Sequence, residues 1–199
     1  MQTNRGINFF APCEGPVDAG LVCQIFAVSG ELQQMISPDH QADLINYFFD
    51  RPAQMFPVIF RDQFVQHRNL YYEAQTSCLP FSFSLSLECI ILAIASDSIN
   101  YEHGHELEKN AKTLVSTLVE LERRTNCETL GSIQACILIG WREAGSAEAG
   151  HYSAMAGALA ASFGLKFDDP SNSTSDFAMS DDEANTRRLI CWGLNVFDR

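Results

Sequence analysis

The stretch of sequence that decides the fold closes the chain: Arg187-Arg188-Leu189-Ile190-Cys191-Trp192-Gly193-Leu194-Asn195-Val196-Phe197-Asp198-Arg199. At helical spacing it begins with basic residues and then gathers bulky apolar side chains on one side: Leu189, Trp192, Val196 and Phe197. Such a helix must bury that stripe, and we expect it to dock on the helices of residues 129–163. Because no cap or glycine follows, we also expect a truncated domain whose outer apolar side is exposed and prone to association.

Composition and charge limit the classes of protein that this sequence can encode. The chain has 199 residues, of which 46% are hydrophobic and 19% charged, a balance typical of one globular domain with a core. A net charge of -12 argues against direct binding to nucleic acid or to an anionic membrane. The most apolar run, residues 89–95, is far shorter than the roughly 20 residues that span a bilayer. Seven scattered cysteines and no recognisable signal peptide favour reduced thiols in an intracellular protein.

The rest of the chain is patterned as helices. Ser37-Pro38-Asp39 is a helix start, with serine as the N-cap, proline in the first position and an acid in the first turn. Pro52 and Pro57 end that helix and open an extended, aromatic-rich connection that reaches Phe64. Further helices are expected over residues 105–125, 129–144, 147–163 with Gly164 as the stop, and after the capping box of residues 180–183.

One segment admits two interpretations. Residues 81–87 alternate between apolar and polar, which is a strand signal, but the run continues without a turn into an apolar stretch, so we favour a helix from Leu85 onward. The sequence then predicts an all-α fold of stacked antiparallel helices, orthogonal or solenoid-like in arrangement. Residues 1–36 form a weakly structured N-terminal segment, and residues 37–199 form the helical domain.

Four blocks of sequence stand in a recognisable order. They are Asp43-Leu44-Ile45-Asn46-Tyr47-Phe48-Phe49 leading to residues 55–64, Leu92-Ala93-Ile94-Ala95-Ser96, Ser132-Ile133-Gln134-Ala135-Cys136-Ile137-Leu138-Ile139-Gly140-Trp141 continuing to Leu165, and residues 185–199. Together they resemble the fungal transcription factor regulatory domain, also called the middle homology region, of binuclear zinc-cluster activators and repressors. The third and fourth blocks are the most specific.

The resemblance implies a non-catalytic regulatory domain that controls transcription in the nucleus. It implies partners that are transcriptional co-regulators or a second copy of the chain, a small-molecule effector, and DNA reached only through a separate module. A binuclear zinc cluster begins with two cysteines separated by two residues, and no such pair occurs here. Zinc is therefore expected only in the missing DNA-binding module, and residues 37–199 would be the N-terminal portion of the regulatory domain. A helical interaction scaffold without a transcriptional role is the alternative function.

Candidate sites are few. The large aromatic residues suggest an apolar ligand pocket near Phe56, Phe60, Trp141 and Trp192, although the two tryptophans also fit as core anchors. Residues 102–106, Glu-His-Gly-His-Glu, could hold zinc or copper, but a polar helix start explains them more simply. The acidic segment 168–183 resembles an activation segment, but a linker followed by a helix cap explains its composition more simply. No hydrolase elbow, phosphate-binding loop or metalloprotease motif is present, so we expect no enzyme.

Overall fold

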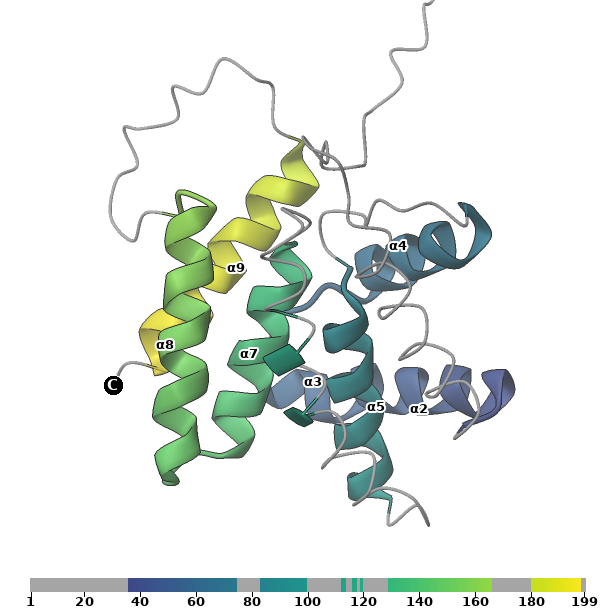
Figure 1. Cartoon of the computed structure of the whole chain (residues 1–199). Helices are drawn as coiled ribbons and strands as arrows, with labels where there is room; N and C mark the ends of the chain where they lie inside the picture. The colour runs from purple at the N-terminus through teal and green to yellow at the C-terminus, as the bar shows by residue number, and fades with distance from the viewer. Residues whose placement is uncertain are drawn as a thin grey trace, which may run out of the picture.

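The computed structural model describes residues 36–74, 83–99, 112–113, 116–117, 119, 129–165 and 180–197. Its main helices are α2 (Pro38–Asp50), α3 (Pro52–Met55), α4 (Arg61–Ala74), α5 (Leu85–Ser98), α7 (Leu130–Arg142), α8 (Ala147–Ser162) and α9 (Asp181–Phe197). No strand occurs among these residues, which confirms the prediction of an all-α fold for the described part of the chain (Figure 1).

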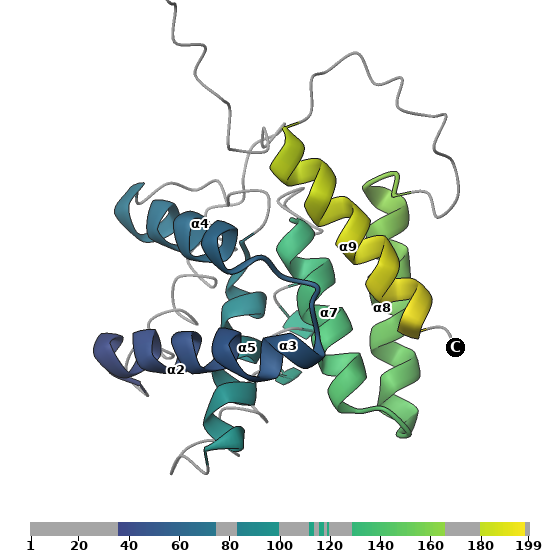
Figure 2. The same cartoon turned by 180° about the vertical axis from the view of Figure 1, so that it is seen from behind.

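Two neighbouring helices, α5 and α7, form the centre of the core. Residues 85–96 of α5 and residues 130–140 of α7 are all buried. In both views α2 and α4 lie on one side of this pair, and α8 and α9 lie on the other (Figures 1 and 2). Because both central helices are covered on both sides, they can be apolar nearly all round, as the sequence suggested for α5.

Local signals placed the helix ends correctly. The Ser37 hydroxyl accepts a hydrogen bond from the His40 amide, and Pro38 is in the first turn of α2. Gly164 has a φ of +63°, and the Leu165 amide donates to the Ala160 carbonyl, so α8 ends in a left-handed glycine cap. The Ser180 hydroxyl accepts from the Glu183 amide at the start of α9. These predictions are therefore confirmed.

The predicted extended connection was too long. It runs only through residues 56–60, because Pro52–Met55 form the short helix α3 and α4 begins at Arg61, so that Phe64 is a helical residue. The buried residues of α4 are Phe64, His67 and Tyr71, at helical spacing. Helix α5 begins at Leu85, with Ser84 as its cap, as favoured. Of the helix expected over residues 105–125, only Lys112, Thr113, Ser116, Thr117 and Val119 are described, and all five are helical. The N-terminal segment 1–35 and residues 166–179 lie outside the described residues.

Helix α9 buries a different face from the one predicted. Ile190 is fully buried and Leu194 is 5% exposed, whereas Trp192 and Val196 are 46% and 47% exposed. A Cβ added at Gly193 would lie 2.8 Å from Cγ1 of Val58, so α9 packs closest where its side chain is smallest. The prediction that the other helices bury Trp192 and Val196 was therefore wrong, although Trp192 still meets Trp141 of α7. The expected exposed apolar surface on α9 is present, and association through it stays a prediction.

Candidate functional site

An open apolar groove lies where four helical segments meet. Its walls come from the end of α3, the end of α7, the first half of α8 and the second half of α9, which lie near one another in both views (Figures 1 and 2). The groove has a volume of about 680 Å³. Its lining residues are Met55, Phe56, Trp141, Ala144, Gly145, Ala149, Gly150, Ser153, Trp192 and Val196.

Three aromatic rings from three different segments form a continuous wall. The rings of Phe56 and Trp141 are 4.9 Å apart between centroids and tilted by 37°. The rings of Trp141 and Trp192 are 6.2 Å apart and perpendicular, an edge-to-face contact. Trp141 therefore stands between the other two, and the perpendicular pair makes a corner with two aromatic surfaces.

Small residues form another part of the lining of the groove. Gly145 has a φ of +91° in the turn between α7 and α8, a backbone conformation that favours glycine. A Cβ added at Gly145 or at Gly150 would meet nothing within 4 Å. The open volume therefore exists because these positions carry no side chain, next to Ala144 and Ala149.

Contacts of Val58 fix the connection that carries Phe56. The side-chain amide of Gln134 on α7 donates to the Val58 carbonyl at 2.6 Å, and both residues are buried. Val58 also packs against Gly193 of α9. The aromatic wall is therefore fixed by contacts to α7 and α9 that lie only two residues beyond Phe56.

The groove is electrically neutral. None of its ten lining residues carries a charged side chain. At the end of α7, the Arg142 guanidinium pairs with Asp97 at 2.7 Å, and the next residue, Glu143, pairs with Lys112. The charges that flank the groove at this end are therefore neutralised by partners.

The structure brings together three of the four residues predicted for a pocket. Phe56, Trp141 and Trp192 all line the groove, whereas Phe60 is 41% exposed and is not a lining residue. Their role in ligand binding stays a prediction. Sequence reasoning missed Met55, which is 75% exposed, and Val196 as groove residues. Val196 lies four residues after Trp192 on the same helix, a spacing that places both on one face.

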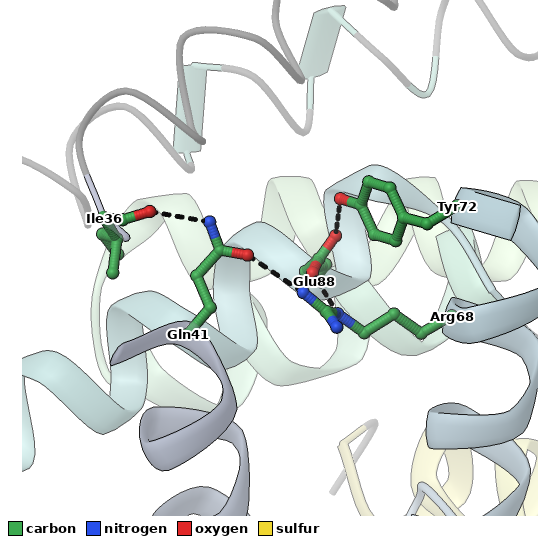
Figure 3. Close-up of polar contacts among 5 residues, drawn as sticks. All are labelled: Ile36, Gln41, Arg68, Tyr72 and Glu88. Carbon is green, nitrogen blue, oxygen red and sulfur yellow. Dashed lines mark hydrogen bonds and ion pairs between the residues drawn. The ribbon is translucent and has the colours of Figure 1, made fainter. Parts of the chain in front are cut away.

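A second cluster of polar residues is enclosed between α2, α4 and α5 (Figure 3). Glu88 of α5 is fully buried, and its two oxygens accept hydrogen bonds from the Arg68 guanidinium at 2.5 Å and from the Tyr72 hydroxyl at 2.7 Å. Arg68 also donates to Gln41, whose amide donates in turn to the Ile36 carbonyl. This chain of bonds joins three helices. Every oxygen of the carboxylate is used, so the cluster is suited to holding α4 in place rather than to acid–base chemistry.

The described residues include no cluster of metal ligands, and two of their thiols have a raised pKa. Burial raises the pKa of the thiols of Cys89 and Cys191, and both cysteines are free. In the described ranges, no group of three or more His, Cys, Asp or Glu residues could hold a metal ion. The histidine-containing segment 102–106 lies outside them. No helix of the described part is long and apolar enough to cross a membrane.

A comparison with models of protein families identifies the family of this chain. Residues 45–199 match the model of the fungal specific transcription factor domain. No curated protein and no solved structure gives a significant match. The match covers most of the chain, including all four blocks that suggested this resemblance apart from the first two residues of the first block.

The class of protein is therefore a domain of fungal transcription factors. The chain belongs to the fungal specific transcription factor domain family. Its role is accordingly a regulatory one within a fungal transcription factor. The aromatic groove and the enclosed Glu88 cluster are features of this member that the family assignment leaves without a function.

Proposed function

We propose that this chain regulates transcription in the nucleus by acting on a separate zinc-cluster DNA-binding module, and that the aromatic groove is where it receives its signal. The family match supports the regulatory role. The net charge of -12 supports a separate module, because a phosphate backbone would repel this chain. Residues 37–199 belong to the regulatory domain, and the zinc belongs to the DNA-binding module.

One observation carries the assignment of the groove. Three of the large apolar side chains that are exposed in the described part, Met55, Trp192 and Val196, lie around this one depression. Large apolar side chains that gather on one exposed surface commonly mark a binding site. The signal is a metabolite or a co-regulator that covers these side chains.

A reporter assay tests the proposal. The full chain is fused to a heterologous DNA-binding module, and transcription is compared with that driven by the module alone. We expect the fusion to change transcription at least threefold, and Trp192→Ala to remove most of that change. Phe60→Ala is the matched control, because Phe60 is a similarly exposed aromatic residue outside the groove.

Two results separate the alternatives. A fusion that drives the same transcription as the module alone contradicts the regulatory role and favours a helical interaction scaffold. Equal effects of Trp192→Ala and Phe60→Ala contradict the role of the groove. Protein levels of each fusion are measured by immunoblot, so that a loss of activity is not mistaken for a loss of protein.

A further inference from the structure

We propose that the groove binds a neutral, planar heteroaromatic molecule that carries hydrogen-bond acceptors at its edge. This inference rests on the proposed function, in which the groove receives the signal. The shape of the groove, the geometry of its rings, its charge and its polar side chains support it.

Shape favours a small molecule of modest size. A volume of about 680 Å³ lies within the range of roughly 300–1,000 Å³ that is usual for small-molecule sites. The lining at Gly145 and Gly150 has no side chains to displace. A ligand can therefore enter without a rearrangement of the core.

Ring geometry favours a flat aromatic ligand. Trp141 and Trp192 stand perpendicular to each other with centroids 6.2 Å apart, and Phe56 lies beside Trp141. A planar ring can stack on one indole face while its edge meets the other, the two arrangements that aromatic groups prefer. A saturated molecule of the same size would bury similar apolar surface but would lose both of these contacts.

Charge excludes anionic ligands from the groove. The lining residues carry no charge, so the site has no cation to pair with a carboxylate or a phosphate. The whole chain carries -12, which repels an anion further. An anionic group would also lose solvation on entering an apolar site without a partner. A neutral ligand is complementary to this environment.

The polar groups of the groove define the edge of the ligand. Among the lining side chains they are the Ser153 hydroxyl and the indole N–H groups of Trp141 and Trp192. The two indole groups can only donate hydrogen bonds, and a serine hydroxyl can donate as well. A ligand that carries acceptors, such as a carbonyl or ring oxygen, matches all three of these side chains.

Coumarin, a neutral planar lactone, is a suitable probe, and the chain reports on it directly. The full chain contains only two tryptophans, and both line the groove. Its two indole N–H resonances in a ¹H–¹⁵N correlation spectrum therefore belong to the site, and Trp192→Phe assigns them.

We expect coumarin to shift both resonances saturably, with a dissociation constant below about 1 mM. Octahydrocoumarin, the saturated lactone, and coumarin-3-carboxylate, the anion, should each bind at least about tenfold more weakly, because aromatic stacking and charge are lost or opposed.

A pair of variants on one helix locates the binding. Gly150→Leu fills the groove, whereas Gly157→Leu adds the same side chain on α8 outside it, and a Cβ at either position meets nothing within 4 Å. Leucine also favours a helix more than glycine does, so both variants should remain folded. We expect coumarin binding to be lost in Gly150→Leu and kept in Gly157→Leu.

Four results would overturn the inference. They are the absence of a saturable shift with coumarin, equal affinity for octahydrocoumarin or for the anion, equal binding by Gly150→Leu, and indole shifts that follow protein concentration without ligand. The last of these would make the groove an interface with a second copy. If coumarin fails while Trp192→Ala still alters the reporter, the ligand class is wrong and the proposed function stands. If coumarin binds but Trp192→Ala leaves the reporter unchanged, the ligand class stands and the proposed function is wrong.

Discussion

Replacing Arg68 with methionine tests the importance of the enclosed polar cluster. Glu88 is fully buried, and the Arg68 guanidinium is the cation that pairs with it, at 2.5 Å. Methionine keeps much of the apolar length of the arginine side chain but removes the charge. The Arg68→Met protein must therefore bury a carboxylate that retains only the Tyr72 hydroxyl as its donor.

The structure sets the size of the expected effect. Removing one partner of a buried ion pair typically costs about 3–5 kcal/mol, because the other charge is left uncompensated. The Arg68 side chain is 19% exposed, so water can reach the vacated position and soften the loss. We therefore expect the free energy of unfolding to fall by about 3 kcal/mol, near the lower end of that range. In a protein of this size, that corresponds to a fall in Tm of roughly 6–12 °C.

The same helix supplies a matched control. Arg61, at the start of α4, pairs with Asp50 at 2.9 Å, but these side chains are 45% and 63% exposed. An exposed pair contributes only about 0–1 kcal/mol, so Arg61→Met should change stability little. The double variant Arg68→Met/Glu88→Met removes both buried charges and should recover to within about 1 kcal/mol of the native protein.

Urea denaturation of the four proteins at pH 7, followed by far-UV circular dichroism, measures these free energies. The reasoning is refuted if Arg68→Met and Arg61→Met cost the same. It is also refuted if the double variant is no more stable than Arg68→Met, because the cost would then come from lost packing and not from an unpaired carboxylate.

Two further predictions follow from other parts of the core. A Cβ at Gly131 would lie 2.8 Å and 2.9 Å from backbone atoms of Ser84 and Phe83, so Gly131→Ala should destabilise by about 3 kcal/mol, whereas Gly157→Ala should stabilise by about 0.5–1 kcal/mol in the same urea assay. Equal effects of the two alanines would contradict this. Burial lowers the pKa of His67 to about 4, against the opposing charge of Asp182. Between pH 7 and about pH 5.5 the unfolded chain gains a proton on His67 that the folded protein does not bind, so stability should fall by about 1 kcal/mol more in the native protein than in His67→Gln. The same fall in both proteins would show that His67 is not responsible.

Helix ends were predictable from the sequence because their signals are local. Ser37 and Pro38 at the start of α2, and Gly164 at the end of α8, act through the few residues beside them. Helix α4 was missed for a related reason. Its buried positions include His67, so the polar ring interrupts the apolar pattern on which a helix prediction relies.

The enclosed polar cluster depends on contacts between distant parts of the sequence. Arg68 lies 20 residues from Glu88 and 27 from Gln41, and sequence periodicity does not reveal which residues meet across helices. One signal was present: Glu88 is the only charged residue within the otherwise apolar or small stretch of residues 85–96. A charge at a position that must be buried requires a partner of opposite sign, even when the sequence does not show where that partner lies.

The error about α9 and the existence of the groove have the same cause. Sequence reasoning assigned burial by bulk and so placed Trp192 inside, but the helix can approach Val58 and α7 most closely through Gly193. Packing that face buries Ile190 and Leu194 and turns Trp192 outward, beside Trp141. If α9 were rotated to bury Trp192, the corner between the two indoles would become part of the core and the groove would close. A glycine thus keeps a tryptophan at the surface, and a binding function for the groove would depend on Gly193 although this residue does not line it.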